Sequence, residues 1–94
     1  MGFLAETDDA YAEAKAEVLR QEIAGKRARA RVFMTTEGSV ESRKAQAEGH
    51  ADVMAADDAY CAATLAYETL RAKRQRAELV IDVFRTLEAS RRKA

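Results

Sequence analysis

The chain is 94 residues long and 48% apolar, with alanine as its commonest apolar residue, four glycines and no proline. This composition favours helix, because alanine has the highest helix propensity and proline the lowest. Sixteen basic residues balance sixteen acidic ones, which excludes a whole-protein field that would draw the chain onto nucleic acid or an anionic membrane, and no apolar run reaches the roughly 20 residues that cross a bilayer.

A first helix is predicted from about residue 6 to residue 34. Thr7, Asp8 and Asp9 offer capping oxygens and negative charge near its start, where the helix dipole is positive. Its second half is rich in arginine, which suits the negative end of the dipole. We therefore expect this helix to begin close to Glu6.

Residues 35–39 predict a turn, because Gly38 can take the left-handed conformation that ends a helix and Ser39 can cap the next one. A short helix is predicted from residue 40 to residue 48. The stretch from Gly49 to Asp52 favours a second break, with Asp52 as the cap of the last helix. The alternative, in which residues 39–52 run into the last helix with only a kink, stays open from the sequence.

The last helix, predicted from about residue 53 to residue 90, carries the most regular pattern in the chain. Apolar side chains recur at alternating spacings of three and four residues, which predicts coiled-coil-like packing. The members of this seam are Val53, Ala56, Tyr60, Ala63, Tyr67, Leu70, Arg74, Ala77, Ile81 and Phe84. A second apolar group beside the seam predicts a homo-oligomer interface made of Leu79, Val80, Val83 and Leu87.

Charge placement predicts how the two long helices pair. Both are acidic early and basic late, so an antiparallel pair sets acid against base at both ends, whereas a parallel pair sets like against like. We therefore predict an all-α fold: one domain over residues 1–94, formed by a long, coiled-coil-like antiparallel helical hairpin with a short connecting helix. Arg74 on the seam predicts a register-setting contact, with Glu13 or Glu17 of the first helix as its partner.

One concentration of basic residues is the candidate for nucleic-acid contact. It consists of Arg71, Lys73, Arg76, Arg91, Arg92 and Lys93, and such a row can follow a phosphate backbone. Acidic residues are interleaved with it, namely Glu68, Glu78, Asp82 and Glu88. The alternative interpretation is therefore a solvated helix face on which acidic and basic side chains pair.

Residues with catalytic or metal-binding chemistry are sparse. His50 is the single histidine and Cys61 the single cysteine, and neither has neighbours at the spacing of a catalytic triad or a zinc set. We expect no enzymatic activity, no metal and no cofactor. A lone cysteine forms no intrachain disulfide, and the start of the chain lacks the basic and apolar regions of a secretory signal, so we expect a bacterial or host cytoplasm and no membrane partner.

Three further segments are TEGSVESRKA at residues 36–45, YETLRAKR at residues 67–74 and FRTLEASR at residues 84–91. They resemble a group of small helical phage and prophage proteins encoded near recombination genes. The resemblance favours a non-enzymatic phage accessory protein that contacts a phage or host protein, beside recombination or replication machinery. Two alternatives are a phage inhibitor that binds a host defence protein and a helical protein that binds nucleic acid directly.

Overall fold

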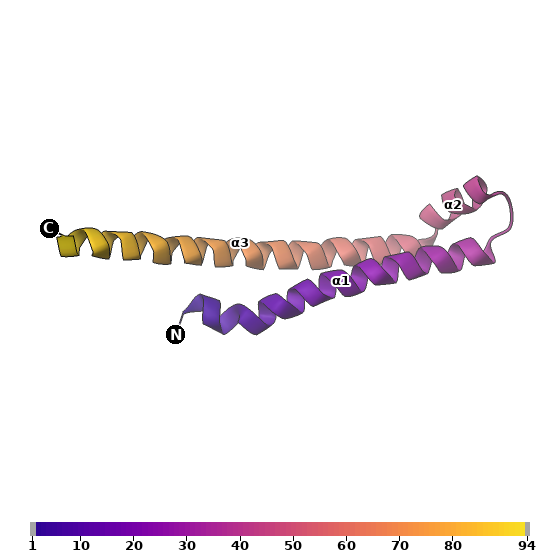
Figure 1. Ribbon diagram of the computed structural model, residues 1–94. Coiled ribbons are helices and arrows are strands. Elements are labelled where there is room, and N and C mark those ends of the chain that lie inside the picture. Colours follow the sequence, from indigo (N-terminus) through magenta and orange to yellow (C-terminus); the bar gives the residue numbers. More distant parts are fainter. Residues whose placement is uncertain (1, 94) are drawn as a thin grey trace.

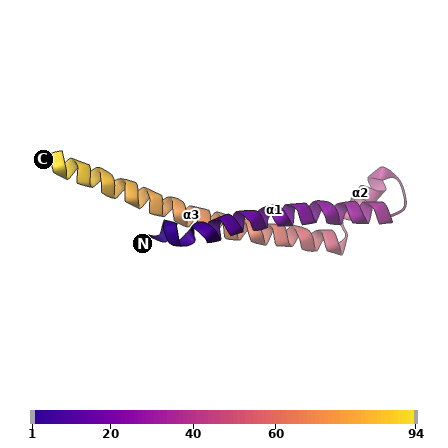
Figure 2. The same cartoon turned by 60° about the horizontal axis from the view of Figure 1, so that its bottom comes forward.

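The computed structural model describes residues 2–93, which form three helices. α1 spans Phe3–Thr35, α2 spans Val40–Glu48 and α3 spans Ala51–Lys93. α1 and α3 lie antiparallel and side by side, and α2 forms the connection at their joined end (Figures 1 and 2). The predicted all-α fold, a long hairpin with a short connecting helix, is confirmed.

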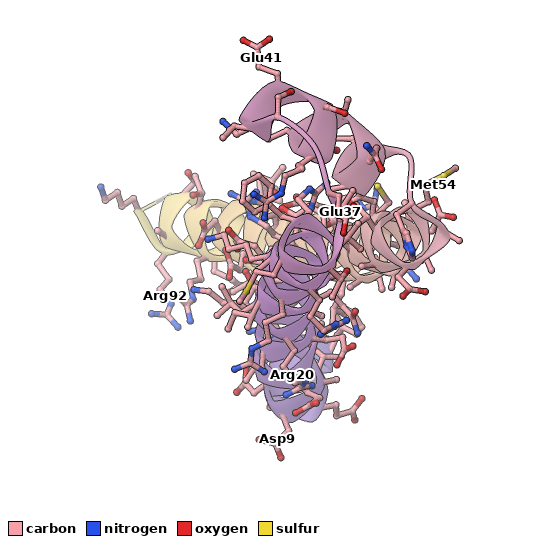
Figure 3. All side chains as sticks on the ribbon, turned by 90° about the vertical axis from the view of Figure 1, so that its right-hand side faces the viewer. Asp9, Arg20, Glu37, Glu41, Met54 and Arg92 are labelled. Atoms are coloured by element: carbon pink, nitrogen blue, oxygen red, sulfur yellow. The ribbon has the colours of Figure 1, made fainter. Side chains whose placement is uncertain are left out.

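The hairpin is elongated and buries little of its own surface. Its extents are 76 × 22 × 14 Å and its radius of gyration is 21.6 Å, whereas a compact chain of this length has a radius of about 12 Å. Its accessible surface is 7224 Å², against about 5,400 Å² for a compact monomer of this mass. Charged side chains such as Asp9, Glu41 and Arg92 point away from the helices (Figure 3).

The core is small and lies at the closed end of the hairpin. Ala28 and Val32 of α1 meet Ala47 of α2 and Val53 of α3, and all four are buried. Val53 is the one large side chain among residues 2–93 that has no exposed surface. The three helices are therefore held together by few apolar contacts at the closed end.

One arginine of α1 links all three helices beside this core. Arg29 donates to Glu48 of α2 over 2.8 Å and to both carboxylate oxygens of Asp57 in α3 over 2.8 and 2.9 Å. These hydrogen bonds, those to Glu48 first, raise the pKa of Arg29. Gly25 is buried one turn earlier, where a Cβ atom would lie 3.3 Å from the Arg29 guanidinium. The glycine thus leaves room for the arginine.

A pair of tyrosines joins α1 to α3 further along the hairpin. The rings of Tyr11 and Tyr67 stack with their centroids 5.3 Å apart and their planes 11° from parallel. Their hydroxyls are 3.2 Å apart, and this hydrogen bond raises the pKa of Tyr67. The seam through Tyr67 is therefore the face of α3 that packs on α1.

α1 begins one turn earlier than predicted. Its first residue is Phe3, and the Gly2 cap position makes no side-chain hydrogen bond. Thr7 lies inside the helix and donates its hydroxyl proton to the Phe3 carbonyl over 2.7 Å. The prediction that Thr7, Asp8 and Asp9 cap α1 is wrong, because the first turn contacts α3 and is kept helical by that contact.

The turn between α1 and α2 follows the sequence signals. Gly38 has a φ of 121°, a conformation that residues with a Cβ atom rarely adopt. Ser39 caps α2, because its hydroxyl accepts a hydrogen bond from the Ser42 amide over 3.2 Å.

A second break separates α2 from α3 at Gly49 and His50. Residues 40–48 therefore form a separate short helix and do not continue into α3 with a kink. The predicted cap is wrong in one detail: the His50 ring nitrogen Nδ1 accepts from the Asp52 amide over 3.1 Å, so His50, and not the side chain of Asp52, caps the first turn of α3. His50 occupies the position directly before the helix, which is where a capping side chain reaches the free amides.

Candidate functional site

α3 extends well beyond the start of α1 (Figures 1 and 2). Within residues 2–93, Arg74 is the last residue of α3 that hydrogen bonds to α1. Ala77, the next seam residue, is half-buried. The start of α1 lies beside Arg74, so α1 does not reach residues 78–93 of α3. We call these residues the overhang.

Six large apolar side chains of the overhang are exposed. They are Leu79 (63%), Val80 (67%), Ile81 (41%), Val83 (51%), Phe84 (62%) and Leu87 (64%). At about 100° of rotation per residue they form, together with Ala77, a continuous arc of roughly 200° around the helix. The remaining strip carries charges, including Glu78, Asp82, Arg85 and Arg92. Single exposed apolar residues are ordinary, but a continuous patch bordered by charges marks an interaction surface.

The predicted oligomer interface lies entirely in the overhang. Leu79, Val80, Val83 and Leu87 occupy the part of the arc that turns away from α1. The spacing of apolar residues assigned Ile81 and Phe84 to the seam that packs on α1, whereas both are exposed in the structure. The available signal was length: the last predicted helix is longer than the first, so its end has no partner within the hairpin.

The six basic residues proposed for nucleic-acid contact do not form one face. All are exposed, and at about 100° per residue they are distributed around the whole circumference of α3. Arg71 pairs with Glu68 over 3.3 Å, which raises the pKa of Arg71, and Arg91 pairs with Glu88. Within residues 2–93, Lys73, Arg76, Arg92 and Lys93 make no ion pair.

This scatter predicts that the protein has no tight, salt-sensitive affinity for DNA. Phosphate binding requires several cations that face one backbone at the same time. Fluorescence anisotropy of labelled single- and double-stranded oligonucleotides, at low and near-physiological salt, measures the affinity directly. Tight binding that falls steeply with salt and is lost when Lys73, Arg76 and Arg92 are together changed to alanine would reverse this conclusion.

Arg74 contacts α1, but through residues other than those predicted. It donates to the Leu4 carbonyl over 2.9 Å, and to the Thr7 hydroxyl and an Asp8 carboxylate oxygen over 2.8 Å each. Its guanidinium also lies 4.7 Å from the centre of the Tyr11 ring. Only 14% of the Arg74 side chain is exposed, so this cation is well enclosed.

The prediction that Glu13 or Glu17 pairs with Arg74 is wrong. Both carboxylates instead contact Arg20 on the same helix, and hydrogen bonds from Gln21 and Arg20 lower the pKa of Glu17. Glu13 lies nine residues beyond Leu4 along α1, or roughly 13 Å at 1.5 Å per residue. The register of the hairpin therefore places both carboxylates out of reach of Arg74.

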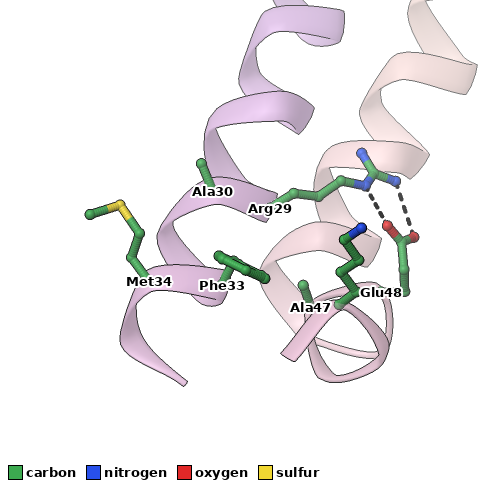
Figure 4. A pocket seen from close by; sticks show the side chains of 7 residues that line it. Arg29, Ala30, Phe33, Met34, Ala47 and Glu48 are labelled. Carbon is green, nitrogen blue, oxygen red and sulfur yellow. Dashed lines mark hydrogen bonds and ion pairs between the residues drawn. The ribbon is translucent and has the colours of Figure 1, made fainter. Parts of the chain in front are cut away.

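A second surface, which was not predicted from the sequence, lies between α1 and α2 (Figure 4). It is a groove of about 610 Å³, lined by Arg29, Ala30, Phe33, Met34, Lys44, Ala47 and Glu48. Arg43 closes one side of Phe33, with its guanidinium 4.1 Å from the ring centre. The spacing of Ala30, Phe33 and Met34 was a signal for an apolar face, but nothing in the sequence placed α2 beside it.

Over residues 2–93 no helix is long and apolar enough to cross a membrane. The same part of the chain contains no group of three or more histidine, cysteine, aspartate or glutamate side chains that could hold a metal ion. No known protein family matches the chain, and neither does any curated protein or solved structure. The fold and its surfaces are thus the observations on which a functional proposal can rest.

Proposed function

We propose that this protein is a non-enzymatic assembly protein that binds another protein chain through the overhang of α3. The observation that carries this proposal is the continuous apolar arc of residues 77–87, which α1 leaves uncovered. An apolar helix face is stabilised when another apolar surface covers it, so such a stripe favours packing against a further helix.

The energetics agree with a binding role. Each of the six large side chains is roughly half exposed, so covering one contributes about 1 kcal/mol. The sum is several kcal/mol, which is comparable to the lower estimates of the entropy lost on association. The arc is thus large enough to support a reversible complex, and leaving it in water exposes the chain to aggregation.

The setting we propose is that of a phage accessory protein near recombination or replication machinery. This part of the proposal rests on the sequence resemblance of residues 36–45, 67–74 and 84–91 alone. The overhang accounts for the action through protein contacts, whichever machinery is involved.

Photo-crosslinking tests the binding role. A benzophenone amino acid at Leu87, on the arc, is expected to crosslink to a protein chain in cells that express the protein. The same probe at Ala89 is the matched control, because Ala89 is also exposed but lies about 200° further around the helix. Crosslinking from neither position, or equally from both, would refute the proposed binding surface.

A further inference from the structure

We infer that the occupant of the overhang is the overhang of a second copy of this chain, in an antiparallel pair about a two-fold axis. This inference rests on the proposed function, since it names the protein that the arc binds. Three observations support it: the continuation of the seam, the placement of two opposite charges, and the amount of surface left exposed.

The seam of α3 continues beyond the start of α1. Arg74 and Ala77 face α1, and Ile81, Phe84 and Glu88 follow at the same alternating spacing of four and three residues. In an antiparallel coiled coil, seam residues of one helix pack between those of the other. A pair in which Ile81 meets Phe84 of the second copy repeats the same contact on the other side of the axis, as an isologous interface requires.

This register also produces favourable contacts on both sides of the seam. Val80 and Leu87 lie on one flank, so Val80 of each copy approaches Leu87 of the other. Glu78 and Arg85 lie on the opposite flank, so each Glu78 approaches Arg85 of the second copy. Both charges are exposed in the single chain, and neither makes an ion pair within residues 2–93.

Other arrangements lose this complementarity. A shift of one heptad brings the two Arg85 side chains together. A parallel pair brings the two basic ends, residues 91–93, side by side, and like charges in contact disfavour a complex. The antiparallel pair instead carries each basic end to a part of the other copy where charges of both signs are exposed, the acidic ones being Glu6, Asp8 and Asp9 at the start of α1 and the basic ones lying in residues 71–76 of α3.

The exposed area allows a short contact between two copies. The surface of 7224 Å² exceeds that of a compact monomer of this mass by about 1,800 Å². A standard interface buries about 800 Å² on each partner. In the Ile81–Phe84 register residues 78–87 of the two copies lie alongside each other, about 15 Å of helix at 1.5 Å per residue, so the contact is smaller than this standard and supports a reversible dimer.

Charge reversal followed by charge exchange tests the pairing. Sedimentation equilibrium of the purified full chain should give twice the 10.4 kDa chain mass. Glu78→Arg and Arg85→Glu should each weaken the dimer tenfold or more, because each sets like charges together on both sides of the axis. The double variant Glu78→Arg with Arg85→Glu should restore the dimer to within about threefold of the unaltered chain.

Asp82→Arg is the matched control. It reverses the charge of a residue that lies between Glu78 and Arg85 in the sequence. Asp82 points further from the Ile81–Phe84 seam than they do, so the dimer should persist. Circular dichroism checks that all variants keep their helix content, which glutamate and arginine both favour.

A monomeric mass at all concentrations, or a double variant that fails to recover, would overturn the inference. These outcomes differ from failure of the proposed function. A crosslink from Leu87 only to a protein of another mass would refute self-pairing and retain the binding surface, whereas absence of any crosslink from Leu87 would refute both.

Discussion

Val53→Asp is expected to unfold the closed end of the hairpin and to lower the stability by about 3–5 kcal/mol, the cost of an uncompensated buried charge. Val53 is fully buried and packs against Ala28, Val32 and Ala47, and no other large side chain in residues 2–93 is buried so completely. Since small domains have only about 5–15 kcal/mol of stability, this loss is a large share of the total.

Urea unfolding followed by circular dichroism measures this effect. The helix signal should fall together with the stability, because helices in water depend on tertiary packing more than on propensity. Met54→Asp is the control: Met54 is the next residue and is 56% exposed, so its substitution should change the stability by no more than about 0.5 kcal/mol. Equal losses in the two variants would show that helix propensity, and not burial, determines the stability.

Much of the fold could be predicted from the sequence because its signals are local. The absence of proline, the turn at Gly38 and Ser39, and the regular spacing of apolar residues in α3 each depend on neighbours within a few residues. The antiparallel pairing followed from the order of charges along each helix. Each of these signals can be read within a single helix or a single turn, and the pairing needs only a comparison of two such helices.

The axial register of the hairpin could not be predicted in the same way. Apolar periodicity shows which face of a helix is buried, but it is unchanged when one helix slides along the other by a heptad. Contacts between distant residues determine the register here, such as Arg29 with Asp57 and Tyr11 with Tyr67. For this reason the sequence identified Arg74 as an unusual seam residue but assigned it the wrong partners.

For the same reason two of the six exposed apolar side chains of the overhang were not predicted as surface residues. Where α1 starts relative to α3 decides whether Ile81 and Phe84 are core or surface, and that position follows from the register. The interface of Leu79, Val80, Val83 and Leu87 was predicted because these residues lie outside the seam whatever the register. The groove beside Phe33 depends on how α2 folds back after the turn, which no local pattern encodes.

Arg74→Met is expected to release the first two turns of α1 from α3 and to lower the stability by about 1.5–3 kcal/mol, the range for hydrogen bonds to a charged group. Methionine keeps the length of the side chain and its helix propensity, so the substitution removes mainly the guanidinium. That group is the common donor to Leu4, Thr7 and Asp8.

Amide hydrogen exchange of residues 4–11 measures the local effect. Protection should fall in these residues while residues 25–32, beside the buried core, keep theirs, because the two ends of the hairpin share few contacts and open independently. Lys73→Met is the matched control, since Lys73 is the preceding residue and is exposed, and it should leave both segments protected. If protection of residues 4–11 survives the loss of Arg74, the Tyr11–Tyr67 stack alone holds the start of α1, and the position at which the overhang begins is then determined by that aromatic pair.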